Sequence, residues 1–168
     1  LEKEWGVGYS IIEKQLNPKT VEVKYENGVI AVIGDVVDST DDLVSCAETV
    51  VPKAQDIYQL TGYFQQAALL YKKTSVTESV GVGLNNVLHH CCEDILIENA
   101  FYKAIGSYVC THKALPLNQY LLVSSKLDLR FMTRALASGV GLIISRTAPT
   151  KQALDKALAA QVGVLGFA

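Results

Sequence analysis

The second half of the sequence alternates short apolar runs with segments of helical apolar spacing. This order predicts strand, helix, strand, helix and strand at Gln119–Ser124, Asp128–Ser138, Val140–Ser145, Thr150–Ala160 and Val162–Phe167. Strands that are joined by helices need crossover connections, which are right-handed and bring the strands together in parallel. The chain is therefore predicted to have an α/β fold whose sheet is parallel in this half.

The first 37 residues predict a small N-terminal portion made of a helix and a β-hairpin. Apolar residues at helical spacing indicate a helix over Glu4–Leu16. The strand-like runs Val21–Tyr25 and Val29–Ile33 flank Asn27-Gly28, a pair that tolerates the positive φ angles of a tight hairpin turn. We therefore expect a portion at residues 1–37 and an α/β domain at residues 38–168, although the two can form one compact unit.

The middle of the chain is expected to mix helices and strands. Asp38–Asp42 offers an N-cap for a helix that runs to about Leu60, with a break at Pro52. Beyond it, the pattern predicts a strand, a loop or long hairpin connection, a strand and a helix at Phe64–Tyr71, Lys72–Asn85, Asn86–Asp94 and Ile97–Val109. The whole sheet is then mixed.

Composition excludes several classes of partner. The chain carries 15 basic and 17 acidic side chains, so no basic surface for nucleic acid is expected. It contains no apolar run of about 18 residues, so no membrane-spanning helix is predicted. Four cysteines without a disulfide framework favour a reducing compartment, and we expect a cytoplasmic protein.

The run His89-His90-Cys91-Cys92 suggests a metal site, but its spacing argues against one. In a strand, alternate side chains point to opposite faces, so each face offers two ligands. A structural zinc ion needs four protein ligands and a catalytic one needs three. No bound metal is predicted, and catalytic residues stay unassigned because the sequence shows no Ser-His-Asp arrangement and no P-loop.

Several polar residues at expected strand ends and helix starts are candidates for ligand binding. Glu93-Asp94 ends a strand, where open α/β sheets bind ligands, although Asp94 can equally be a helix cap. Asn99 and Lys103 share one helix face and can meet a ligand or solvent. Thr61-Gly62 is either a turn open to a ligand or a helix C-cap.

Two more features have a functional and a plain structural interpretation. The corner Thr147-Ala148-Pro149-Thr150 presents free backbone N–H groups to an anion, as every strand-to-helix corner does. Cys46 lies in an expected helix four residues after Asp42, which is compatible with a reactive thiolate but more typical of a core cysteine.

Motifs along nearly the whole chain resemble, in order, those of the formate dehydrogenase accessory protein family. The central segment, from Glu93-Asp94 through Asn99-Ala100 and Lys103 to Ile105-Gly106, is similar to that family's signature. Further segments that resemble the family are Trp5–Ile12, Thr61-Gly62 with Ala67-Ala68, Leu121–Ser124, Thr147–Thr150 and Gly163–Phe167.

The resemblance implies a three-layer α/β/α fold like that of cytidine deaminases. It also implies a homodimer that receives sulfur from a cysteine desulfurase and passes it to the molybdenum bis-guanine-dinucleotide cofactor of formate dehydrogenase. The residues that would bind the guanine nucleotide part are Thr61, Gly62, Glu93, Asp94, Asn99, Lys103, Ser124, Ala148, Pro149 and Thr150.

The sequence departs from the family pattern at several ligand positions. Gly34–Asp38 stands where the family has its sulfur-carrying cysteine loop, and Gln65 stands where it has a histidine. Leu96, Ile97 and Glu98 replace a Gly-Arg-His run, and residues 74–90 look like an insertion. The alternative is therefore a degenerate nucleotide-binding module that transfers no sulfur.

Overall fold

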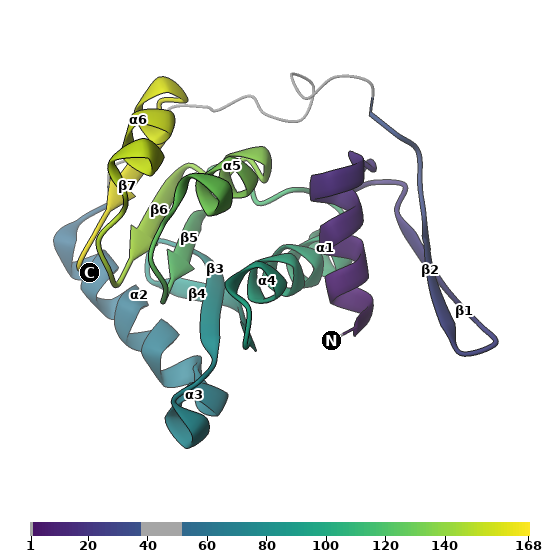
Figure 1. Ribbon diagram of the computed structural model, residues 1–168, viewed down its shortest axis with the longest axis horizontal. Helices are drawn as coiled ribbons and strands as arrows, with labels where there is room; N and C mark the ends of the chain where they lie inside the picture. The colour runs from purple at the N-terminus through teal and green to yellow at the C-terminus, as the bar shows by residue number, and fades with distance from the viewer. Residues whose placement is uncertain (1, 38–51) are drawn as a thin grey trace.

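The computed structural model describes residues 2–37 and 52–168 and shows an α/β protein with a mixed five-stranded sheet and an N-terminal hairpin (Figure 1). In chain order the elements are α1 Glu2–Lys14, β1 Glu22–Glu26, β2 Val29–Ile33, α2 Ala54–Ala67, α3 Leu69–Thr74, β3 Glu78–Leu84, β4 Val87–Asp94, α4 Ile97–His112, β5 Tyr120–Val123, α5 Leu129–Ala137, β6 Leu142–Ser145, α6 Lys151–Ala159 and β7 Gly163–Leu165.

The strand order in the main sheet is β4-β3-β5-β6-β7. β5, β6 and β7 are parallel neighbours, and they are linked by α5 and α6. β3 pairs antiparallel with both β5 and β4. The predicted parallel part in the second half and the mixed sheet are thereby confirmed.

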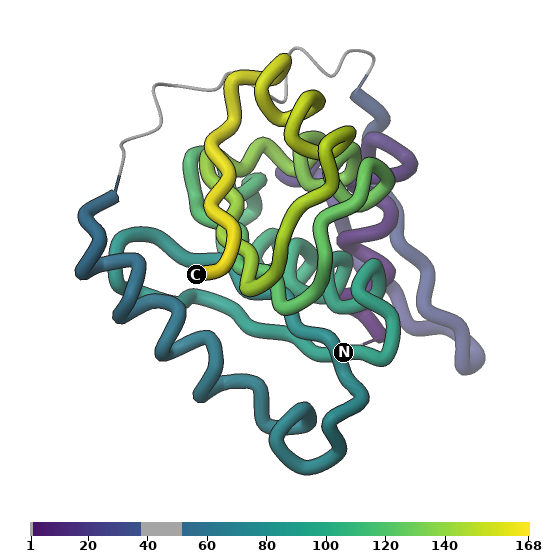
Figure 2. Tube along the Cα trace, turned by 60° about the vertical axis from the view of Figure 1, so that its left-hand side comes forward, coloured from purple at the N-terminus to yellow at the C-terminus, as the bar shows by residue number. Residues whose placement is uncertain are grey.

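Helices cover both faces of this sheet. On one face Leu121, Val123 and Ile143 belong to the larger core, together with buried residues of α4, α5 and α6. On the other face Leu60 and Phe64 of α2 pack against Tyr120, Leu122, Leu142 and Ile144. Figure 2 shows α2 running along this second face, away from α4. The predicted three-layer arrangement follows from these two cores.

The N-terminal hairpin forms as predicted, and α1 packs closely on α4. Asn27 and Gly28 have φ angles of 51° and 76°, and Glu26 pairs with Val29 across the turn. A Cβ atom built on Gly8 would lie 1.9 Å from the carbonyl oxygen of Tyr102, and one on Gly106 would lie 1.7 Å from that of Glu4. The two helices therefore touch backbone to backbone. The proposed division at residues 37 and 38 stays a prediction.

Two predictions for the middle of the chain are wrong. The expected strand Phe64–Tyr71 is helical, and α2 runs on through Gly62 to Ala67, so Thr61-Gly62 is no turn. The expected connection and apparent insertion contain β3, the second strand of the sheet. Its glycines explain the error, because Gly81 and Gly83 leave room for Phe64 and Leu60 of α2.

Smaller differences lie near the ends of the described residues. α6 begins one residue after its predicted start at Thr150, whose hydroxyl caps the helix by accepting a hydrogen bond from the Ala153 N–H at 3.2 Å. Leu158 is 78% exposed, so α6 buries mainly its alanines.

The expectations for Asp38–Asp42 and Cys46 concern residues outside the described part of the chain. Within residues 2–37 and 52–168 no helix is long and apolar enough to cross a membrane.

Candidate functional site

A cavity of about 240 Å³ opens where β5 and β6 end and β3 begins. Open α/β sheets bind ligands at the carboxyl ends of their parallel strands, so this is the expected place for a site. The cavity is lined by Phe64, Gln65 and Ala68 of α2 and its C-terminal end, Tyr71 of α3, and Glu78, Ser79, Ser124, Arg146 and Thr147 at the strand ends.

Ser124 holds Glu78 in place at this cavity. Its hydroxyl accepts a hydrogen bond from the Ser79 N–H at 2.8 Å and lies 2.5 Å from Glu78 Oε2, to which it donates. The Ser124 N–H also donates to the Ser79 carbonyl at 3.1 Å. The Glu78 carboxylate therefore has one oxygen engaged by Ser124, and its position is fixed before any ligand arrives. Arg146 is exposed at the same strand end and can meet negative charge.

Asp94, Asn99 and Lys103 form one cluster, in which Asn99 and Lys103 share a helix face as their spacing predicted. Lys103 Nζ lies 2.5 Å from Asp94 Oδ2, and the Asn99 amide donates to Asp94 Oδ1 at 3.2 Å. The indole N–H of Trp5 donates to Asn99 Oδ1 at 2.9 Å, so the cluster is also tied to α1. These groups largely satisfy one another, and none of them lines the cavity at the ends of β5 and β6.

The electrostatics of the cluster are those of an ion pair. Burial alone would raise the pKa of Asp94, but hydrogen bonds from Lys103, the Leu96 N–H and Asn99 hold that pKa below its ordinary value. The carboxylate is then ionised at neutral pH and neutralised by the ammonium of Lys103. Asp94 also accepts the N–H of Leu96, which is itself the N-cap residue of α4, and it accepts no N–H from the first turn of the helix, so it is not the helix cap that one interpretation expected.

Glu93, near the end of β4, caps the first turn of the short helix α3 and does not line the cavity. Its two carboxylate oxygens accept the N–H groups of Leu70 and Tyr71, each at 2.8 Å, and the Thr77 hydroxyl donates to it at 3.2 Å. These contacts fix the end of α2 and the start of α3 above β4, and thereby position Tyr71 at the cavity wall.

The remaining predicted site residues lie elsewhere. Thr61 is buried in α2 and donates its hydroxyl to the Tyr58 carbonyl at 3.0 Å. Thr61 and Gly62 line a separate, open hollow on the outer face of α2. Of Ala148, Pro149 and Thr150, the last donates its N–H to the Leu127 carbonyl at 2.8 Å and caps α6. Of the ten predicted site residues, Ser124 is the one that lines the cavity, so the structure does not bring the set together.

Sequence reasoning missed Glu78 and Arg146. Arg146 lies between the last residue of β6, Ser145, and the Thr147–Thr150 corner, so extending that corner by one residue toward the strand would have included it. Glu78 was hidden in the segment taken for a connection. The alternation of Val80, Val82 and Leu84 with small residues was the signal for a strand there.

Three of the four cysteines are described, and burial disfavours their thiolate forms. Burial, with the nearby charges of Cys92 and Glu93, raises the pKa of Cys91 to about 12. Burial likewise raises the pKa values of Cys92 and Cys110. Because the thiolate is the nucleophile, these three are poor sulfur acceptors at neutral pH. Among the described residues no group of three or more His, Cys, Asp or Glu is arranged to hold a metal ion.

Comparisons with known proteins place this geometry in a family. The model of the FdhD/NarQ family matches residues 6–168. A sulfur carrier protein FdhD from Staphylococcus haemolyticus is 29% identical over 120 residues, which are 71% of this chain and 44% of that protein. A sulfur carrier protein FdhD from Sulfurisphaera tokodaii is 26% identical over 175 residues, which cover 95% of this chain and 64% of that protein. The chain thus spans less than two thirds of the length of these curated relatives.

Two solved structures share the fold. A crystal structure from Desulfotalea psychrophila, described as that of a formate dehydrogenase accessory protein, superposes with a TM-score of 0.83 at 20% identity. It covers 99% of this chain and 73% of the other. A mutant protein in complex with 8-azaguanine gives a TM-score of 0.50 at 11% identity, over 79% of this chain and 91% of that one. Because the family model matches the chain from residue 6 to its last residue, this protein belongs to the FdhD/NarQ family.

Proposed function

We propose that this chain is an accessory protein for the maturation of formate dehydrogenase. It would act in the cytoplasm as a homodimer, take the molybdenum bis-guanine-dinucleotide cofactor as cargo, and support sulfur transfer from a cysteine desulfurase. Membership of the FdhD/NarQ family supports this assignment, together with the sulfur carrier proteins that the chain resembles. The fold would be the cytidine-deaminase-like one that the sequence led us to expect.

The observation that carries the proposal is the cavity at the ends of β5 and β6. Its volume of about 240 Å³ is below the ~300–1,000 Å³ of typical small-molecule pockets. It therefore suits one base of the cargo better than the whole dinucleotide. The likeness to a chain that binds 8-azaguanine, a purine analogue, supports a base at this fold.

The chemistry of the lining residues favours guanine. The Watson–Crick edge of guanine presents N–H donors, which a carboxylate accepts, and Glu78 supplies that carboxylate. The Gln65 amide can donate to the guanine carbonyl, and the exposed Arg146 guanidinium can approach the diphosphate. Adenine offers an acceptor where guanine has its ring N–H, so Glu78 would repel it. For the rest of the nucleotide we still propose the ten residues expected from the sequence, which are Thr61, Gly62, Glu93, Asp94, Asn99, Lys103, Ser124, Ala148, Pro149 and Thr150.

Titration calorimetry with guanosine diphosphate and adenosine diphosphate tests this site. We expect the wild type to prefer the guanosine form and Glu78→Gln to weaken its binding about 10- to 150-fold, the equivalent of ~1.5–3 kcal/mol for a charge-assisted hydrogen bond. Adenosine diphosphate binding should change little. Glu98→Gln is the matched control, because Glu98 is a carboxylate at the start of α4 that does not line the cavity. Equal guanosine diphosphate binding by Glu78→Gln and the wild type would contradict the assignment.

Sulfur transfer separates the proposal from its alternative, a degenerate nucleotide-binding module without transferase activity. Burial raises the pKa values of Cys91, Cys92 and Cys110, so among the cysteines of this sequence we propose Cys46, which lies outside the described residues, as the sulfur carrier. We expect a cysteine desulfurase with cysteine to load a persulfide on the wild type and to load none on Cys46→Ser. Intact mass spectrometry reads the added sulfur. An unloaded wild type that still binds the nucleotide supports the alternative.

A further inference from the structure

The short helix α3, at the lower end of Figure 1, forms part of the wall of the candidate cavity but contains no buried residue. Its first three residues, Leu69, Leu70 and Tyr71, are 60%, 49% and 44% exposed among the described residues. A helix of six residues is too short to be stable by its own hydrogen bonds, and its N-cap residue, Ala68, makes no side-chain capping bond. The position of α3 therefore depends on polar contacts with the rest of the chain.

Glu93 makes the contact that joins the start of α3 to the sheet. Its carboxylate accepts the N–H groups of Leu70 and Tyr71, each at 2.8 Å, which have no partner within α3 because they lie in its first turn. Hydrogen bonds to an ionised group are stronger than those between neutral groups. Lys72 donates to the Gln66 carbonyl at 2.9 Å, but this bond ties α3 to α2 and not to the sheet. The place of Tyr71 at the cavity is thus set by Glu93.

Two aromatic residues line the cavity, and they differ in how far their rings are already engaged. Phe64 is 2% exposed and belongs, with Tyr120 and Leu122, to the core between α2 and the sheet. Tyr71 belongs to neither apolar core within the described residues. The faces of nucleic-acid bases stack on aromatic side chains, whereas the carboxylate of Glu78 can meet only the edge of a base. Contact with the face of a base is therefore left to Tyr71.

We propose that the ring of Tyr71 stacks on the face of the bound base, and that Glu93 is a positioning residue that holds Tyr71 at the cavity. This inference rests on the nucleotide binding proposed above and gives that site its aromatic contact. Glu93, which the sequence suggested as a ligand-binding residue, then acts through Tyr71 and not by touching the nucleotide. Recognition is divided between two residues: Glu78 selects guanine by its edge, and Tyr71 adds affinity for any base, because every base has a face.

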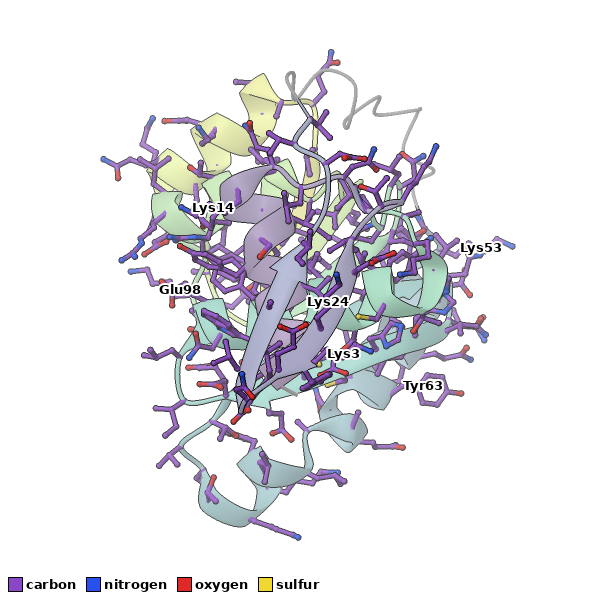
Figure 3. All side chains as sticks on the ribbon, turned by 90° about the vertical axis from the view of Figure 1, so that its right-hand side faces the viewer. Lys3, Lys14, Lys24, Lys53, Tyr63 and Glu98 are labelled. Carbon is purple, nitrogen blue, oxygen red and sulfur yellow. The ribbon has the colours of Figure 1, made fainter. Side chains whose placement is uncertain are left out.

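Titration calorimetry with guanosine diphosphate tests the stacking contact. We expect Tyr71→Leu, which removes the ring but keeps an apolar side chain, to weaken binding about 5- to 150-fold. Tyr71→Phe keeps the ring and should bind like the wild type. Tyr71→Leu should weaken adenosine diphosphate binding by the same factor, because stacking does not read the edge of the base. Tyr63→Leu is the matched control, because Tyr63 points outward from α2 in Figure 3 and does not line the cavity.

A double-mutant cycle tests the role of Glu93. Glu93→Gln replaces one of the two accepting oxygens by an NH₂ donor, so α3 loses one of its two backbone anchors. We expect this change to weaken guanosine diphosphate binding severalfold in the wild type. It should add nothing in the Tyr71→Leu variant, because Glu93 acts only through the Tyr71 ring. Glu98→Gln, at the start of α4, should leave binding unchanged in both backgrounds.

The outcomes separate this inference from the proposed function. A wild type that binds no guanosine diphosphate would overturn the nucleotide site and, with it, the stacking contact. A wild type that binds, together with a Tyr71→Leu variant that binds equally well, would overturn this inference alone, while Glu78→Gln still tests the proposed function. Additive losses from Glu93→Gln and Tyr71→Leu would overturn the positioning role of Glu93.

Discussion

Some residues of the candidate site hold neighbouring elements of the fold together, and others line the cavity. Spacing placed Asn99 and Lys103 on one helix face, and the structure adds Asp94 and Trp5 of α1 to them. Spacing along one helix reports which side chains share a face, but it does not report which other element covers that face. Glu78 could not be selected from the sequence because its partner Ser124 lies 46 residues away.

Histidine side chains make the stability of the folded protein depend on pH. The register shift between Val82 and Gly83 leaves His89 as the extra residue beside His90, and both rings lie about 6 Å from the ring of His112. Burial, and then the charges of His112 and His89, lower the pKa of His90 below its ordinary value of 6.5. The folded protein therefore prefers neutral His90, whereas the unfolded chain binds the proton near pH 6.5.

We expect the free energy of unfolding to be highest above about pH 6.5. It should fall as the pH drops from there through the lowered pKa of His90. His90→Gln should reduce this fall, because it removes the group whose proton affinity differs between the two states. Urea unfolding at several values between about pH 7.5 and 5.5 measures the slope. His89→Gln should reduce the fall only slightly, because the charge of His89 is the smallest of the causes that lower the pKa of His90. An unchanged slope in His90→Gln would refute the assignment.

At the scale of elements, the sequence predicted best where local patterning and tertiary packing agree. The hairpin, α4, and the alternating strands and helices of the second half appear where their periodicities placed them. The middle failed because packing overrides local propensity there. Gly62 lies inside α2, where Leu60 and Phe64 pack the helix against the sheet. The glycines of β3 leave space for those two side chains.

Two helix glycines predict opposite responses to the same change. A Cβ atom at Gly106 would meet the backbone carbonyl of Glu4, so Gly106→Ala should force α1 away and destabilise the protein by ~1–3 kcal/mol or more. A Cβ atom at Gly62 meets nothing within 4 Å, so Gly62→Ala should stabilise α2 by about 0.5–1 kcal/mol. Chemical denaturation compares both with the wild type. A Gly106→Ala variant as stable as the wild type would contradict the close helix contact.

At the scale of the whole molecule, the N-terminal portion shares its core with the rest of the chain. Val7 and Ile11 of α1 and Val21 beside the hairpin belong to the same apolar cluster as α4 and the sheet. Composition could not show this, because an amphipathic helix indicates only that some surface covers it. The extent of that shared core favours one cooperative unit over two independent parts.

The single tryptophan makes this cooperativity measurable. Trp5 stacks on Tyr9 at a centroid distance of 5.2 Å and donates to Asn99 of α4, so its fluorescence reports the docking of α1. We expect denaturant curves from tryptophan fluorescence and from far-ultraviolet circular dichroism to have the same midpoint. Trp5→Phe supplies the fluorescence baseline. A fluorescence transition at lower denaturant would instead show that residues 1–37 unfold as a separate domain.

The contact between α1 and α4 also constrains how the chain can be made. Trp5 and Asn99 are 94 positions apart, and synthesis runs from the N-terminus, so α1 leaves the ribosome long before the helix that receives it. During that interval the apolar side of α1, with Val7 and Ile11, lacks the α4 surface that covers it in the folded protein. The contact between the two helices can therefore form only after α4 has emerged from the ribosome.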